Sequence, residues 1–149
     1  TVTNFFNMTK AADKLIQLDE YLSTKRVEWT DKIKDLTVSL KRGEKLEEVS
    51  AYTLSYRQIL IENLATMSSK IRSQKATLDK NYKLKWIEYF NYDYKLSDRQ
   101  REKFIEADLS DDRHIYDLLV SQKNFIEGSI KTLDNMGFAI KNRLDISKL

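Results

Sequence analysis

Hydrophobic residues recur along this chain at spacings of three, four and seven, which is the period of one face of an α-helix. The first stripe consists of Leu15, Leu18, Leu22, Trp29, Ile33, Leu36 and Leu40. Thr9 is a suitable N-cap at its start, and Gly43 is a suitable stop because glycine readily takes the left-handed conformation. The pattern predicts a helix of about eight turns, followed by a turn that sends the next helix back antiparallel.

A second stripe has a period of about 3.5 to 3.6 residues and extends from Glu44 to about Phe90. Its members are Leu46, Val49, Thr53, Tyr56, Leu60, Met67, Ile71, Leu78, Tyr82 and Tyr89. Only a partner along the whole length can cover such a stripe, so the pattern favours a coiled coil or a helical bundle.

Polar residues between Asn91 and Ser97, Asp93 among them, interrupt the second stripe. Ser97 and Gln100 fit a capping box, in which each side chain bonds the other residue's backbone N–H, and this predicts a short helix to about Asp108. Ser110, followed by two aspartates, predicts the start of the last helix, because acids favour the positive end of the helix dipole.

The apolar positions of this last helix are Ile115, Leu118, Leu119, Phe125, Ile126, Ile130, Leu133, Phe138, Ile140 and Leu144. Gly128 and Gly137 lie within the pattern, where each costs about 1 kcal/mol relative to alanine. We expect Gly128 to allow close approach of another helix, and Gly137 either to do the same or to break the helix after Asn135.

The sequence therefore predicts an all-α fold of long antiparallel helices, a helical hairpin or bundle with coiled-coil character. The absence of proline and the presence of only three glycines agree with this fold class. We expect one domain over residues 1–149, with helices at 1–43, 44–91, 97–108 and 110–146. Because a short helix cannot cover the long second stripe, homo-oligomerisation is expected to complete the core.

Several kinds of chemistry are excluded or disfavoured by composition. The chain has no cysteine, so disulfides and thiolate sites are absent. No apolar run approaches the roughly 20 residues that span a bilayer, and residues 1–8 lack the features of a secretory signal, so we expect no membrane association and a cytoplasmic location. Three scattered glycines cannot build a phosphate-binding loop. We therefore expect no enzymatic activity, no cofactor and no metal.

Positive charge is concentrated in residues 66–95, which hold seven basic and three acidic residues, although the net charge of the chain is only +3. Aromatic residues are interleaved with these cations, and cations with flat rings are what binding of single-stranded nucleic acid requires. A solvated helix face with ordinary lysines explains the same charges equally well. On a helical wheel Tyr82, Trp86 and Tyr89 point near Leu78, so they are expected to belong partly to the core. The candidate nucleic-acid-binding residues are Arg72, Lys75, Lys80, Lys83, Lys85, Tyr89, Phe90, Tyr92, Tyr94 and Lys95.

The single histidine, His114, lies three residues from both Asp111 and Asp117, so all three share a helix face. Such a face is able to ligate a metal or to provide an acid and a base, but a di-iron bundle site needs a second histidine. An exposed histidine among ordinary helix charges is the preferred interpretation.

Two segments carry a more specific pattern. One is Phe125–Ile130, followed by Leu133, Asn135 and the run Gly137–Asn142; the other, upstream, is the basic and aromatic run Lys83–Asn91. In this order they resemble the phage recombination-mediator family typified by UvsY, over about residues 70–144.

The resemblance implies a non-enzymatic protein that binds single-stranded DNA and assembles into a ring-like homo-oligomer. It also implies a role in loading a recombinase onto DNA that a single-strand-binding protein had coated, in the host cytoplasm if the chain is phage-encoded. Lys83, Lys85, Tyr89 and Phe90 would then serve DNA. The residues that would serve assembly are Phe125, Ile130, Leu133, Phe138, Ile140 and Leu144.

Two other hypotheses remain open at the level of sequence. A structural or adaptor coiled-coil protein, acting only through protein contacts, fits the periodicity equally well. A helical-bundle enzyme built around His114 is the third, and nothing in the sequence favours it.

Overall fold

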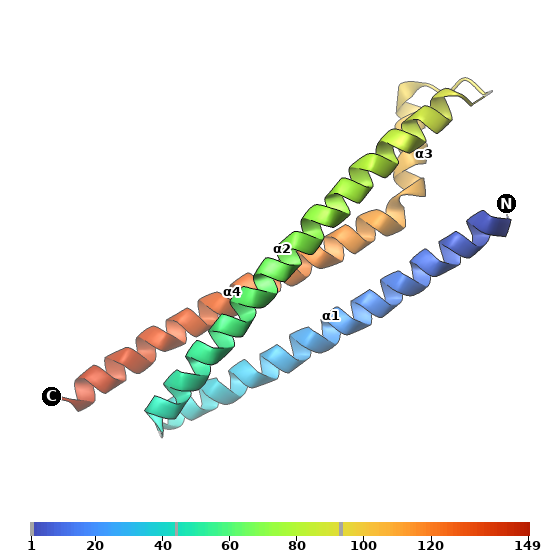
Figure 1. Ribbon diagram of the computed structural model, residues 1–149. Coiled ribbons are helices and arrows are strands. Elements are labelled where there is room, and N and C mark those ends of the chain that lie inside the picture. The colour runs from blue at the N-terminus through green and yellow to red at the C-terminus, as the bar shows by residue number, and fades with distance from the viewer. Residues whose placement is uncertain (1, 44, 93) are drawn as a thin grey trace. The chain divides into compact units, whose positions relative to one another are not determined.

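The computed structural model describes residues 2–43, 45–92 and 94–149, with side chains from residue 12 on. These residues form helices and no strand, which confirms the all-α prediction (Figure 1). The helices are α1 (Val2–Arg42), α2 (Leu46–Phe90), α3 (Asp98–Asp108) and α4 (Ser110–Ser147). Within the described residues no helix is long and apolar enough to cross a membrane.

The first helix differs from the prediction at its start and agrees with it at its end. Because α1 begins at Val2, Thr9 lies inside the helix and the N-cap assigned to it is wrong. The stop is confirmed: α1 ends at Arg42, and Gly43 follows with a φ of 69°. Lys45, with a φ of 51°, also takes the left-handed conformation, so the turn is tight and α2 begins at Leu46. Residues 44 and 93, to which the predictions gave a helix start and part of the break, lie outside the described residues.

The starts of the last two helices are as predicted. The Ser97 hydroxyl accepts from the Gln100 backbone N–H at 3.2 Å, and the Gln100 side chain accepts from the Ser97 N–H at 3.0 Å, which completes the capping box of α3. Two aspartates occupy the first turn of α4, which begins at Ser110.

The expectations for the two internal glycines are wrong. The helix α4 continues through both Gly128 and Gly137 to Ser147, so Gly137 is not a break. Outside the helix's own neighbouring backbone, no described atom lies within 4 Å of a Cβ built at either glycine. Neither glycine therefore marks a close approach between helices.

The chain divides into two compact units, which helices α1, α2 and α4 each enter. Unit 1 consists of Thr1–Glu20 and Ser69–Val120, and unit 2 consists of Tyr21–Ser68 and Ser121–Leu149. That the whole chain acts as one domain stays a prediction.

In unit 2, the segments of α1 and α2 run antiparallel on either side of the turn at Gly43 (Figure 1). The Trp29 ring meets the Tyr56 ring edge-on at 5.6 Å between centroids. Further along, α4 is parallel to α1, because Arg26 donates to Gln122 at 2.8 Å and Arg143 donates to the carbonyl of Leu40. Three helices therefore enclose the core of this unit.

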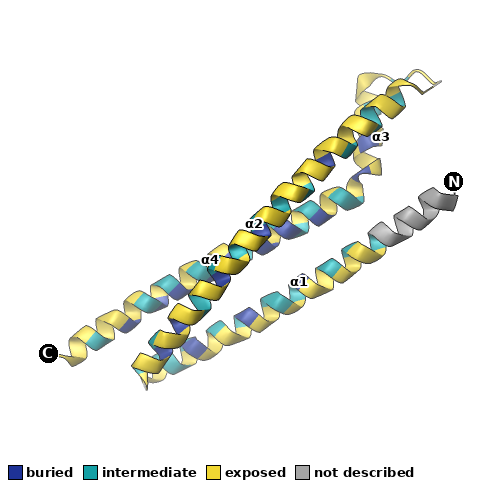
Figure 2. Cartoon of the chain, in the orientation of Figure 1, coloured by how far each residue is buried: buried dark blue, intermediate teal, exposed yellow. Residues whose placement is uncertain are grey.

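Most of the core of unit 2 comes from the predicted stripes, and its buried positions recur along one side of each helix (Figure 2). Gln122, Ser129 and Met136 are buried although they were not among the predicted positions. The described buried residues of this unit are Leu22, Trp29, Leu36, Val49, Thr53, Leu60, Met67, Gln122, Ile126, Ser129, Leu133, Met136 and Ile140. Two of the polar members have hydrogen-bond partners: the Thr53 hydroxyl donates to the Val49 carbonyl at 2.7 Å, and the Gln122 side chain accepts from Arg26 at 2.8 Å.

Among the residues whose side chains are described, unit 1 has fewer buried members than unit 2. Leu78 of α2, Ile105 of α3 and Leu109, which caps α3, form a buried cluster. Trp86 and Tyr89 are partly buried against it, as predicted. The same prediction is wrong for Tyr82, which is 39% exposed and does not pack against the cluster. Gln74 joins α2 to the start of α4 by donating to the Asp112 carbonyl at 2.9 Å.

Candidate nucleic-acid interface

The basic and aromatic surface lies in unit 1, where the C-terminal half of α2 packs against α3. Five of the six cations in the predicted nucleic-acid-binding set are exposed and make no ion pair with any described residue: Arg72, Lys75, Lys80, Lys83 and Lys95. Unpaired surface cations keep their full charge for a polyanion, so these five remain candidates for phosphate contacts.

Lys85, the sixth predicted cation, has a different environment. Its ammonium lies 3.2 Å from a Glu88 carboxylate oxygen and 3.8 Å from an Asp108 carboxylate oxygen. The Tyr89 hydroxyl donates to the same Asp108 carboxylate. Lys85 and Tyr89 therefore link α2 to the end of α3 through Asp108. The charge of Lys85 is balanced by the two carboxylates.

The hydrogen bond to Asp108 is the main cause that raises the pKa of Tyr89, from 10.0 to about 12; burial and the negative charge of Asp108 add to it. Because the folded state holds this proton more tightly than the unfolded chain, the contribution to stability is present below about pH 10 and is lost as the pH rises towards 12. We expect the difference in urea-unfolding free energy between the natural protein and Tyr89→Phe to shrink as the pH rises from 9 to 11.

Asp108→Asn is the control for this pH dependence. It removes the charge that opposes ionisation of Tyr89, so the same comparison in the Asp108→Asn background should vary less with pH. A difference that is constant between pH 9 and 11 in the natural background would contradict the assignment.

The predicted stacking residues beyond the packed stripe are well exposed. The exposed fractions are 69% for Phe90, 57% for Tyr92 and 75% for Tyr94. The Tyr92 ring packs in a tilted arrangement against the Tyr89 ring, with 6.0 Å between the centroids. Tyr94 follows the end of α2. Three aromatic rings are therefore offered to solvent around the C-terminal end of α2.

Arg101 of α3 is a residue of this surface that sequence reasoning missed. Its guanidinium carbon lies 5.0 Å from the centroid of the Trp86 ring and 5.5 Å from that of Phe90, both within the range of cation–π attraction. Arg101 also donates to Asp98 at 3.1 Å and to the Leu96 carbonyl at 3.4 Å. Its Nε is buried and makes no hydrogen bond in the described structure.

Arg99 and Lys103 are two further exposed cations of α3 that sequence reasoning passed over. Neither makes an ion pair with a described residue. Counting charge by segment hid them, because residues 96–120 hold four bases and seven acids. The signal that would have found them is their spacing of four, which places both on one side of the helix.

One side of α2 carries both cations and an exposed aromatic ring. At about 100° per residue, Arg72, Lys83 and Phe90 lie in nearly the same direction on the helix. Asp79 shares this side, so the row of cations is not continuous. The arrangement suits two or three phosphate contacts next to a set of exposed rings, a combination used for sequence-tolerant binding of single strands.

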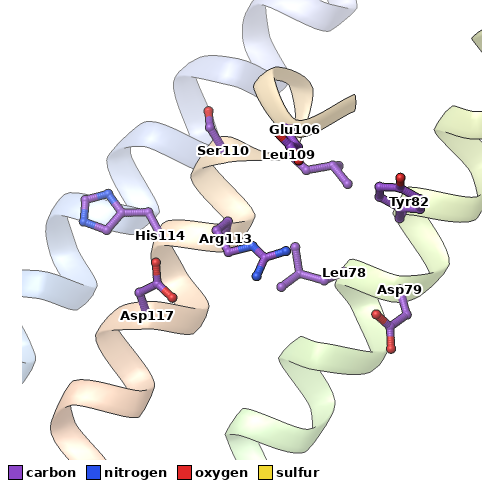
Figure 3. A pocket seen from close by; sticks show the side chains of 9 residues that line it. All are labelled: Leu78, Asp79, Tyr82, Glu106, Leu109, Ser110, Arg113, His114 and Asp117. Carbon is purple, nitrogen blue, oxygen red and sulfur yellow. The ribbon is translucent and has the colours of Figure 1, made fainter. Parts of the chain in front are cut away.

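The surroundings of His114 do not resemble a metal centre. His114 and Asp117 line a pocket of about 690 Å³ in unit 1. In Figure 3 His114 points away from α2, whereas Arg113 reaches towards Leu78. Within the described residues, no group of three or more His, Asp or Glu side chains is placed to hold a metal ion.

The residues that the resemblance assigns to assembly fall into different environments within unit 2. Leu133 and Ile140 are each 1% exposed, because other residues of the same chain cover them. That these two residues take part in assembly stays a prediction. Phe125, Ile130 and Leu144 are half-buried. Phe138 is 68% exposed and is therefore the member of the set most accessible to another chain.

Fold and surface together define a class: an all-α protein with an exposed basic and aromatic face. Comparison of the chain with models of protein families, with curated proteins and with solved structures finds no match.

Proposed function

We propose that this protein is a non-enzymatic, single-stranded-DNA-binding protein that uses the surface formed by the end of α2 and by α3. The observation that carries the proposal is the combination of unpaired cations with three exposed aromatic rings, Phe90, Tyr92 and Tyr94. Cations contact the phosphates of any strand, but rings stack only on bases whose faces are open, so the combination favours single strands over duplex.

The biological role we propose is that of a recombination mediator, which helps to load a recombinase onto single-stranded DNA coated by a single-strand-binding protein. This part rests on the resemblance of Lys83–Asn91 and Phe125–Asn142 to the family typified by UvsY. It includes homo-oligomerisation, for which Phe138 is the exposed assembly residue. Several weak sites in one assembly would bind a long strand tightly through multivalency.

Lys83→Ala tests the phosphate contacts. In anisotropy titrations of a labelled single-stranded oligonucleotide, the plot of log K against log salt should become shallower by about 0.7, because each contact to a single strand contributes about that slope. Affinity at low salt should fall several-fold. The variant should fold normally, since Lys83 is exposed and unpaired in the described structure.

Two variants serve as controls for Lys83→Ala. Lys131→Ala removes an exposed lysine of unit 2 and should leave both affinity and slope unchanged. Lys85→Ala should keep the slope, because Glu88 and Asp108 already balance that charge. Equal changes in all three variants would point to a general charge effect and would sink the proposed site.

An adaptor protein that acts through protein contacts is the second candidate, and one observation favours it. In unit 2, Arg57 and Asp134 pair at 2.5 Å between α2 and α4, and the antiparallel register around this pair brings Leu54 and Phe138 to the same level. These two side chains are 66% and 68% exposed. Apolar side chains that gather in an exposed patch mark protein-binding surfaces, whereas interfaces with DNA are more polar.

A further inference from the structure

The two aromatic rings Trp86 and Phe90 lie one turn apart on α2, and a side chain from another helix contacts both. Arg101 of α3 places its guanidinium 5.0 Å from the first ring and 5.5 Å from the second. Only 11% of the Arg101 side chain is exposed, so this cation is largely removed from water. Desolvation strengthens the attraction between a cation and the face of a ring.

The guanidinium is fixed in direction by hydrogen bonds near the start of its own helix. It donates to Asp98, in the first turn of α3, and to the carbonyl of Leu96, just before it. Since the Ser97 capping box fixes this turn, the guanidinium is held in place before any ligand arrives. Arg101 is thus a rigid support rather than a mobile surface cation.

The Phe90 ring lies against the Arg101 guanidinium and is also exposed to solvent. It is 69% exposed although the guanidinium lies against it, so most of the ring remains accessible. A ring held by a cation on one side loses little freedom when a base stacks on its open side, because its position is already restricted.

Arg101 is poorly placed to bind phosphate itself. Its side chain is nearly buried, its charge faces Asp98 at 3.1 Å, and its Nε is inaccessible. The phosphate-binding cations of the surface are exposed, as Lys83 and Arg99 are. The role of Arg101 in binding is therefore separate from charge neutralisation.

We propose that Arg101 is a positioning residue that holds Phe90 as a stacking surface for an unpaired nucleobase, and that α3 in this way supplies the preference for single strands over duplex. The inference rests on the proposed function. In a duplex both faces of a base are covered by its neighbours, so a supported ring adds nothing to duplex binding. Exposed lysines, by contrast, contribute to the binding of single strands and of duplex.

The test compares Arg101→Ala with Arg99→Ala, a matched arginine of the same helix that is exposed and unpaired in the described residues. Anisotropy titrations use a labelled single strand and the same sequence as duplex. For Arg101→Ala we expect about tenfold weaker binding of the single strand, duplex binding within twofold of the natural protein, and an unchanged salt slope. For Arg99→Ala we expect similar, small losses on both ligands.

Two conservative variants guard against simple loss of folding. Arg101→Lys keeps the cation and should recover part of the single-strand affinity, whereas Arg101→Met keeps the length without the charge and should not. Helicity by circular dichroism should be the same for both. Equal single-strand affinity of the Lys and Met variants would overturn the cation–π support.

A measurement without DNA separates the inference from the proposed function. Trp29 is 7% exposed, so acrylamide quenching of the two tryptophans reports mainly on Trp86. We expect Arg101→Ala to increase the quenched fraction. If quenching rises but single-strand affinity does not fall, the positioning role is overturned while DNA binding stands. If the natural protein does not bind the single strand, the proposed function fails, and the inference fails with it.

Discussion

Replacing Phe90 by alanine should weaken binding of single-stranded DNA by about 5- to 150-fold, because stacking of a base on an aromatic ring contributes about 1–3 kcal/mol. The ring is 69% exposed and its removal breaks no hydrogen bond, so the variant should keep its fold. Anisotropy titration at fixed salt measures the effect. Duplex binding should change little, since paired bases have no open face.

Tyr21→Ala is the matched control for Phe90→Ala. Tyr21 is an exposed aromatic residue of unit 2, with the Lys25 ammonium 5.7 Å from its ring centroid, so it offers the same kind of group outside the proposed surface. It should leave single-strand affinity unchanged. Equal losses from both substitutions, or none from Phe90→Ala, would contradict the assignment of the stacking surface to the end of α2.

Replacing Ile105 by alanine should lower the free energy of unfolding by about 2–5 kcal/mol, the range for truncating a fully buried isoleucine. Ile105 is 0% exposed and is the α3 member of the buried cluster in unit 1. Loss of this contact should release α3 from α2, and single-strand affinity should fall although no proposed contact residue has changed. Urea unfolding followed by circular dichroism measures the stability.

The control is Ile146→Ala, which truncates an isoleucine of α4 that is 68% exposed. It should change the unfolding free energy by less than about 0.5 kcal/mol, as is usual for surface substitutions. A small effect of Ile105→Ala would mean that the cluster is not a core for unit 1.

Local sequence signals predicted the helices and most of their ends. Gly43 and the capping box at Ser97 act through backbone groups within a few residues, so a single sequence is enough to find them. Thr9 failed as a cap because a polar residue at the head of an apolar stripe is compatible with a helix that simply continues past it. The two glycines of α4 failed for a similar reason: helices tolerate glycine without any packing role.

The candidate site was only half predictable, because part of it depends on contacts between helices. Exposure of the rings near the end of α2 follows from their place beyond the apolar stripe. The pairing of Lys85 with Asp108, and the position of Arg101 against Trp86, join residues 15 or more positions apart in sequence. Periodicity within α2 carries no information on which side chain of α3 will meet it.

Contacts between helices also decide which of the predicted assembly residues are exposed, so the sequence alone could not separate them. Ile140 and Phe138 are two residues apart, yet one is 1% and the other 68% exposed. Hydrophobicity alone does not distinguish them, and only the direction in which each points from α4 decides which is covered within unit 2.

Helices α1, α2 and α4 each pass from one unit into the other without a break. Extending an existing helix is favourable, whereas starting a new one is costly, so helical turns already formed in one unit promote those that continue from it. The two units should therefore melt with a degree of thermodynamic cooperativity that two domains joined by a loop would lack. A destabilising substitution in either unit would then loosen the other through the shared backbone, with no side-chain contact needed to transmit it.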